Sequence, residues 1–285
     1  MNKTFKLYGI IFIIVMVLLV LLEMSKADVV DWRKTYEVDS KNPFGLYIFD
    51  QEASKLLNNQ LSKVDVSPYD YYQDKKKYAP HNILIIQKDI DEESWNKIFK
   101  LVDLGSDVMI ISDQSENYIL DSTAILFRKI NNEEINTLKF TDNKFKNDSL
   151  VIDKFPNRTG FRYVERNDQI IGSTETPGVY GANFLKLNLG KGHIYYHSEP
   201  LFLTNYYLLK PNGGKYVETV FSYLPNRKTI WFGTGKSSEQ SRGSALSFIL
   251  ANPPLKYAWY LLWIGLLIFI FFQAKRKQRI IPIVK

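Results

Sequence analysis

Two long uncharged apolar segments, one near each end of the chain, constrain most strongly what this sequence can form. The first covers residues 7–22 and, as a helix, would span about 24 Å, close to the ~30 Å hydrocarbon core of a membrane. The second covers residues 257–274, begins with a cluster of Trp and Tyr, and is followed at once by the basic run KRKQR. Interfacial aromatic residues and a basic flank are typical of membrane-spanning helices. We therefore predict two transmembrane helices. A buried core helix is the alternative for the second segment.

The N-terminal segment also has a second interpretation. A basic start, an apolar middle and the small residues of Ser25-Lys26-Ala27 fit a cleaved signal peptide as well. The apolar run is long for a signal peptide, and Lys3 and Lys6 can reach the lipid–water interface. We therefore predict a retained anchor, with the cleaved signal as the alternative.

The net charge of +7 is concentrated at the two ends of the chain. Between Ser25 and Leu255 the 29 Lys plus Arg are balanced by 29 Asp plus Glu, so the middle is neutral. A nucleic-acid-binding domain would carry its positive charge on the folded part, and we predict no nucleic-acid partner. Basic residues beside apolar segments instead indicate membrane topology, with both termini in the cytoplasm.

These observations predict four parts. They are an N-terminal membrane anchor (1–27), an extracytoplasmic domain (28–254), a transmembrane helix (255–274) and the start of a cytoplasmic tail (275–285). The expected location is the bacterial cytoplasmic (inner) membrane, with the main domain on the periplasmic side. The chain has no cysteine, which excludes disulfides, thiol nucleophiles and cysteine-ligated zinc.

Strand and helix patterns alternate in the first half of the central domain. Residues 44–50, 81–87 and 107–113 are typical of strands, while residues 51–61 and 91–105 have helical spacing of apolar residues. This order predicts a βαβαβ arrangement and a parallel sheet. A helix at 213–224, a strand at 228–235 and a helix at 244–252 follow later. The region from Tyr118 to Ser198 has period-two patterns, which predict a β-rich insertion or an antiparallel extension of the sheet.

The stretch HIYYHSEPLFLTNYYL, residues 193–208, contains His193 and His197 four positions apart. On a helix such a pair could hold one metal ion, but the local composition is typical of a strand, where the two residues would lie ~13 Å apart. We therefore predict no metal site and no cofactor. Glu199 and Ser198 are close in sequence to His197, which leaves a hydrolytic site as an alternative. Pro200 is expected to end the strand, and Asn205 to hydrogen-bond the backbone of the following turn.

Two further stretches could contact a ligand. GTGKS (residues 233–237) resembles the end of a phosphate-binding loop, but Ile230 stands where that motif requires its first glycine. We interpret it as a polar loop after a strand, where α/β folds bind ligands, and Thr234, Lys236 and Ser237 are its candidate residues. YDYYQDKKKY (residues 69–78) could stack on a sugar ring, although a solvated loop is the simpler interpretation.

Several of these motifs resemble a known bacterial family. DWRKTY (31–36), KNPFGLYIFDQ (41–51), GKGHIYYHSEPLFLTNYYLL (190–209) and the terminal RIIPIV are similar to the family called domain of unknown function 4350. That family resembles the extracytoplasmic part of gliding-motility ABC-transporter auxiliary proteins. The resemblance implies a flavodoxin-like, glutamine-amidotransferase-like α/β sheet. It does not carry over amidotransferase chemistry, because that nucleophile is a cysteine. It also implies association with MoxR-type AAA ATPases in a membrane complex.

Two functions remain open at this point. The first is a non-catalytic, membrane-anchored binding or scaffolding module for a protein partner or an envelope glycan. Its candidate contact residues are His197, Glu199, Asn205 and Tyr206 in the turn and Thr234, Lys236 and Ser237 in the polar loop. The second is a cryptic hydrolase that uses His197 and Glu199. An enzyme would require a pocket in which these groups and a hydroxyl converge.

Overall fold

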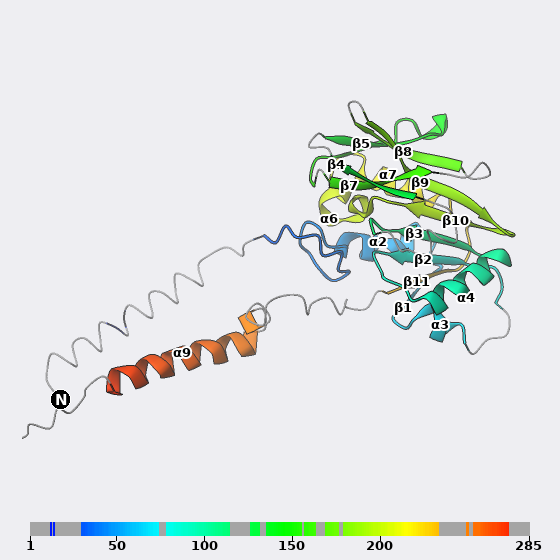
Figure 1. Cartoon of the computed structure of the whole chain (residues 1–285). Coiled ribbons are helices and arrows are strands. Elements are labelled where there is room, and N and C mark those ends of the chain that lie inside the picture. The colour runs from blue at the N-terminus through cyan, green and yellow to red at the C-terminus, as the bar shows by residue number, and fades with distance from the viewer. Residues whose placement is uncertain are drawn as a thin grey trace, which may run out of the picture. The chain divides into compact units, whose positions relative to one another are not determined.

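The structure is a computed structural model. It describes residues 12, 14, 30–73, 78–114, 126–131, 135–155, 157–163, 169–176, 179–233, 249–250 and 253–273. The chain divides into two compact units, Met1–Gly235 and Lys236–Lys285. The first unit contains a large β-sheet with helices on its faces, and the second contains helix α9 (Pro253–Gln273) (Figure 1).

The first unit begins with alternating helices and strands and continues with a series of strands. In chain order its elements are α2 (Tyr47–Leu56), β1 (Leu61–Val64), α3 (Pro68–Tyr71), β2 (Asn82–Ile86), α4 (Glu92–Asp103), β3 (Asp107–Ile111), β4 (Leu126–Asn131), β5 (Asn136–Phe140), η1 (Asn143–Phe145), β6 (Leu150–Ile152), β7 (Asn157–Tyr163), β8 (Gln169–Thr176), β9 (Val179–Leu189), β10 (Gly192–His197), η2 (Pro200–Leu203), α6 (Asn205–Leu208), α7 (Gly213–Phe221) and β11 (Thr229–Phe232).

The strands of the described residues form one mixed sheet. Its main path runs β1-β11-β2-β3-β10-β9-β8-β5-β6, with β4 and β7 attached beside β9. The first five strands of this path are parallel, and the strands from β9 onward are antiparallel (Figure 1). Strand β10 joins the two halves, because it pairs in parallel with β3 and in antiparallel with β9.

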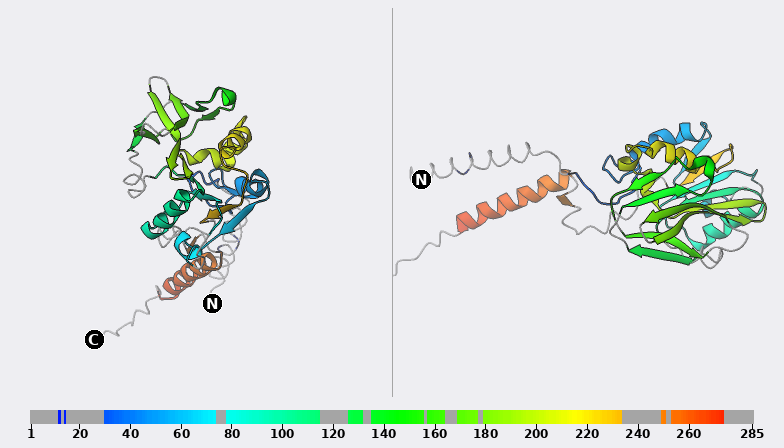
Figure 2. Two further views of the ribbon diagram at one scale, coloured as in Figure 1. Left: turned by 90° about the vertical axis from the view of Figure 1, so that its right-hand side faces the viewer. Right: turned by 90° about the horizontal axis from the view of Figure 1, so that it is seen from above.

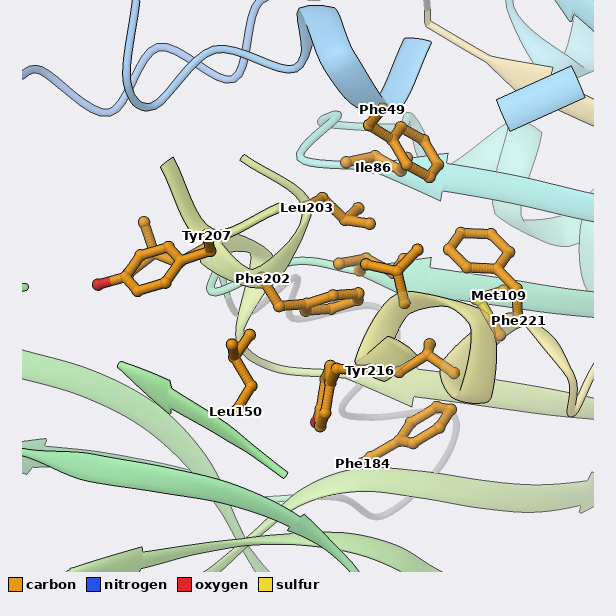
Figure 3. Packing of buried hydrophobic residues seen from close by; sticks show 14 of the residues in the cluster. Phe49, Ile86, Met109, Leu150, Phe184, Phe202, Leu203, Tyr207, Tyr216 and Phe221 are labelled. Atoms are coloured by element: carbon orange, nitrogen blue, oxygen red, sulfur yellow. The ribbon is translucent and has the colours of Figure 1, made fainter. Parts of the chain in front are cut away.

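Two hydrophobic cores lie on the two faces of this sheet. Alternate residues of each central strand point to opposite faces, so Leu84 of β2 enters one core and Ile83 the other. Helices α2, α6 and α7 cover the first face, and α3 and α4 cover the second (Figure 2). In the first core Phe49, Phe202 and Tyr216 approach the strands from three different helical segments (Figure 3).

Helix α4 forms where the sequence predicts it. The Asp91 side chain caps its N-terminus by accepting a 2.7 Å hydrogen bond from the Ser94 backbone N–H. Trp95, Ile98 and Val102 form its buried stripe. Gly105 follows the last turn with a φ of +109°, a conformation that glycine adopts without strain.

The prediction of a strand at residues 44–50 is wrong, because helix α2 begins at Tyr47. The backbone N–H of Ile48, in the first turn, donates a 2.8 Å hydrogen bond to Asn205 Oδ1. This N–H would otherwise lack a partner within the helix. The cap comes from a residue 157 positions away, so local sequence patterns do not contain it. The predicted helix at 244–252 falls mostly outside the described residues.

The predicted fold class combined a parallel sheet and a β-rich insertion with two flanking transmembrane helices, and these flanking helices are wrong. Among the described residues no helix is long and apolar enough to cross a membrane. The strands from β9 onward form the antiparallel extension of the sheet that the period-two patterns predict. Most of the proposed N-terminal anchor lies outside the described residues. The predicted cellular location and the orientation of the termini are not tested by this finding.

Candidate functional site

Polar residues follow three neighbouring parallel strands at the edge where those strands end. Gln87 follows β2, Ser112 and Asp113 follow β3, and Glu199 follows β10. The Gln87 side chain links two of these strand ends: its Nε2 donates to Asp113 Oδ1 at 2.6 Å, and its Oε1 accepts from Ser112 Oγ at 2.9 Å. Together with Tyr36, which packs over them, these residues are called the edge cluster below. This edge of a parallel sheet is where α/β folds usually bind ligands.

Two residues of the edge cluster have a strained backbone. Gln87 has a φ of +45° and Tyr36 a φ of +52°, both in the left-handed region that residues with a Cβ rarely adopt. Each such residue costs roughly 1–3 kcal/mol and persists only where the surroundings hold it in place. In Gln87 the strain directs the side chain to the end of β3, where its hydrogen bonds offset part of that cost.

Tyr36 places a buried hydroxyl group within the edge cluster. This hydroxyl has no hydrogen-bond partner in the protein, although the Gln87 side chain lies nearby. Burial raises the pKa of Tyr36 well above its ordinary value, and the negative charges of Asp113 and Glu199 raise it further. The phenol is therefore neutral, and it occupies a position of negative electrostatic potential.

His197 lies at the end of β10, and its imidazole is completely buried in the first core. Its Nδ1 accepts a 3.1 Å hydrogen bond from the Glu199 backbone N–H, so the proton is on Nε2, which lies 3.0 Å from the Tyr216 hydroxyl. Burial lowers the pKa of His197 to about 3. The imidazole is therefore neutral at physiological pH, and no solvent reaches it.

Glu199 is also buried, and it supports the turn that follows β10. Its carboxylate accepts a 3.3 Å hydrogen bond from the Leu201 backbone N–H at the start of η2. The bond between Glu199 and His197 uses the glutamate backbone, so it does not form the carboxylate–imidazole pair of a general base. These contacts therefore do not include the pairing of the Glu199 carboxylate with the His197 imidazole that the hydrolase alternative would use.

Asn205 connects the turn after β10 to the segment of residues 40–48. Its Oδ1 accepts from the Ile48 backbone N–H, and its Nδ2 donates to the carbonyl oxygens of Ser40 (2.9 Å) and Asn42 (2.7 Å). The predicted bonding to backbone is thus present, but it reaches residues 40–48 instead of its own turn. These three bonds use both donor hydrogens of the amide and one lone pair of its oxygen, so the role of Asn205 is structural.

Tyr206 belongs to a group of aromatic side chains beside the edge cluster. Its ring lies 5.8 Å from that of the exposed Trp32, and Lys210 Nζ lies 4.7 Å above it. Its hydroxyl and Lys210 both bond Asp153, at 3.1 Å and 2.8 Å. We call the following group the aromatic surface: Trp32, Phe155, Tyr206, Lys34, Lys154 and Lys210. Each of its three lysines lies over one of its three rings.

The candidate residues of the polar loop cannot be compared with the structure. Thr234, Lys236 and Ser237 lie outside the described residues, and so does most of the loop that contains them. In the stretch 69–78, Tyr72 is buried against Phe232, while Tyr69 is partly exposed with Lys97 over its ring. Tyr71 and Tyr78 are partly buried against the second core, so Tyr69 is the most exposed ring of this stretch among the described residues.

A polar network at the opposite edge of the sheet was not predicted. Asp107 is buried at the start of β3, and its carboxylate bonds Arg227 Nη2 at 2.5 Å and His193 Nδ1 at 2.9 Å. Arg227 also donates to Asn82 and to the carbonyl oxygen of Gly105. The pairing of β10 with β3 places His193 directly opposite Asp107, and only the strand order reveals this. The described residues contain no cluster of three or more potential metal ligands.

Comparisons with known proteins give only distant likenesses. No family model matches the chain, and no curated protein matches it. A ThuA-like protein from Bacteroides uniformis has a TM-score of 0.42 at 8% identity, with 62% of this chain and 83% of that chain covered. A β-galactosidase from Bacillus circulans sp. alkalophilus gives 0.33 at 8% identity, covering 44% and 21%. An exo-β-1,4-mannosidase from an Opitutaceae bacterium gives 0.35 at 11% identity, covering 50% and 24%.

The chain thus spans less than a quarter of the length of these two glycosidases. Likenesses at such TM-scores carry no argument about function. The resemblance to domain of unknown function 4350 is untested by these comparisons and stays a prediction.

Proposed function

We propose that this protein is a non-catalytic binding module that recognises a protein partner at the carboxyl edge of its parallel strands. The observation that carries this proposal is the aromatic surface beside that edge. Trp32 exposes about half of its side chain, and Tyr206 packs against it under the Lys210 ammonium group. Aromatic side chains with an apolar body and a polar tip are enriched at protein–protein interfaces and often dominate their binding energy.

The buried polar groups support binding over catalysis. The His197 imidazole is neutral and closed to solvent, and Asn205 is used to join two motifs. Glu199 supports a turn from a buried position. A general base must reach the proton that it abstracts, and these side chains have structural contacts instead. The aromatic surface, in contrast, lies outside the core, so a partner can bind there without any rearrangement of the core.

The test is affinity capture with the tagged full-length protein from cells that express it. The Tyr206→Ala variant should recover at least tenfold less of the specific partner than the wild type, because a central aromatic contact is worth about 1.4 kcal/mol or more. Tyr69→Ala is the matched control: this tyrosine also carries a lysine over its ring, at 5.5 Å, but lies on α3, outside the aromatic surface. Equal capture by wild type and Tyr206→Ala, or equal loss in both variants, would contradict the proposal.

A further inference from the structure

The segment of residues 30–38 lies across the candidate binding edge, and we call it the strap. Its Trp32 ring packs edge-on against Tyr206. Its Lys34 ammonium group lies 3.9 Å from the Asp113 carboxylate. The strap is thus the chain's own occupant of the edge at which we propose that a partner binds.

The strap makes these contacts at every second residue. Trp32 packs against Tyr206, Lys34 approaches Asp113, and Tyr36 lies near Gln87 and Glu199. The backbone bends at Arg33 and is left-handed at Tyr36, so these contacts come from an irregular segment and not from a strand. The strap thus presents an aromatic, a cationic and a second aromatic side chain to this edge, at alternate positions in the sequence.

The backbone of the strap is held by hydrogen bonds from Tyr36 N–H to Phe44 O and from Leu46 N–H to Glu37 O, but two of its side chains are not satisfied. The hydroxyl groups of Thr35 and Tyr36 are both buried and both lack a hydrogen-bond partner in the protein. Tyr36 has a left-handed backbone in addition. On release these hydroxyls would be hydrated and the backbone would relax, which favours opening of this segment before the core unfolds.

We propose that the strap is a displaceable cover, and that an extended segment of the partner protein takes its place. This segment carries a cationic side chain flanked at alternate positions by aromatic ones. The cation would replace Lys34 at Asp113, and the aromatic side chains would replace Trp32 and Tyr36. Phe155, Tyr206, Lys154 and Lys210, which lie outside the strap, are then the part of the aromatic surface that the partner contacts. An acidic segment would be repelled by Asp113 and Glu199. This inference rests on the proposed function for the identity of the partner, whereas opening of the strap is independent of it.

The first experiment measures opening with a single cysteine, which is possible because the chain has none of its own. Thr35→Cys places a thiol at a partly buried strap residue whose own hydroxyl is buried, and Ala53→Cys places one in the fully buried core side of α2. Under native conditions the Thr35→Cys protein should react with a maleimide at least about tenfold faster than the Ala53→Cys protein. Val38→Cys, a second strap reporter, should behave like Thr35→Cys. Equal rates at the strap and core positions, in proteins with matching thermal melts, would overturn the displaceable strap.

The second experiment uses a synthetic peptide of residues 30–38 as the probe. Added in excess, it should compete with the strap and increase the labelling rate of Thr35→Cys several-fold, while leaving Ala53→Cys unchanged. The same peptide with Lys34→Glu should have no such effect. Failure of the native peptide to accelerate labelling, or equal acceleration by both peptides, would overturn the replacement at Asp113. Neither result depends on the capture experiment, so the two proposals can fail separately.

Discussion

At the residue scale, His197 and Asn205 are both buried at the end of β10 or just after it, and their hydrogen bonds give them different roles. His197 accepts from the Glu199 backbone, and its other ring nitrogen contacts Tyr216. Asn205 bonds three backbone groups of residues 40–48. In both cases the hydrogen bonds of the side chain, and not the residue type, show that its role is structural.

Burial of His197 makes the stability of the protein depend on pH. Its folded pKa of about 3 lies below the ordinary value of 6.5, so on acidification the unfolded chain takes up this proton first. The contribution of the neutral imidazole is complete above pH 6.5 and is lost as the pH falls toward 3. Between pH 7 and pH 5 the loss should be about 2 kcal/mol. Urea unfolding at both pH values should show a correspondingly smaller loss in His197→Gln. An equal loss in both proteins would contradict this interpretation.

Asn205 should be a major contributor to stability. Asn205→Ala removes three hydrogen bonds from partly buried backbone groups and should lower the free energy of unfolding by about 2–4 kcal/mol. Asn205→Asp keeps the acceptor for Ile48 but turns a carboxylate oxygen toward two carbonyl groups, so it should be at least as harmful at pH 7. Chemical denaturation measures both variants. A wild-type stability for Asn205→Asp would refute the assigned bonding.

At the element scale, local sequence patterns predict the elements that are stabilised locally. The helix at Glu92–Asp103 has its own cap, apolar stripe and terminal glycine, and the strands at Asn82–Ile86 and Asp107–Ile111 are continuous apolar runs. The helix at Tyr47–Leu56 depends on a distant cap from Asn205, and its start was therefore predicted as a strand. Glu199 of the edge cluster was predicted as a contact residue, but Gln87, Ser112 and Asp113 were missed for a similar reason: three strand ends meet there only after the sheet has formed.

The cap of α4 provides a test at this scale. Asp91→Ala removes the acceptor for the Ser94 backbone N–H and should lower the free energy of unfolding by about 1 kcal/mol. Asp89→Ala is the matched control, because Asp89 is an exposed carboxylate two residues earlier and outside the helix. Its effect should stay within about 0.5 kcal/mol. Thermal or urea unfolding of the two variants compares them directly, and indistinguishable values would argue against the cap.

At the scale of the whole sheet, the two edges differ in their roles. The edge where the parallel strands begin is held by the buried ion pair of Asp107 and Arg227, which connects the starts of β2, β3 and β10 through Asn82 and His193. The edge where these strands end carries strain, unpartnered hydroxyls and the strap. The ion-pair network therefore fixes the strands at one edge, while the strap at the other edge can open without disturbing it.

The ion pair should be important because its carboxylate, Asp107, is buried and Arg227 is only partly exposed. Arg227→Lys cannot reproduce the several bonds of the guanidinium group and leaves Asp107 poorly compensated, so it should lower the free energy of unfolding by about 3 kcal/mol or more. Arg33→Lys is the matched control, since Arg33 bonds Asp31 at 2.6 Å but is exposed to solvent. Exposed pairs contribute roughly 0–1 kcal/mol. Similar urea midpoints for the two variants would contradict the structural role of the network.

The most direct test of the central claim, that this protein binds a partner and does not catalyse a reaction, is a complementation assay. Tyr206→Ala, Glu199→Gln and His197→Gln would each replace the native gene, and the phenotype would be compared with that of a deletion strain. The account predicts that Tyr206→Ala behaves like the deletion, while the other two variants restore function wherever they fold. Full function of Tyr206→Ala, combined with loss of function in a Glu199→Gln protein that melts like the wild type, would contradict it.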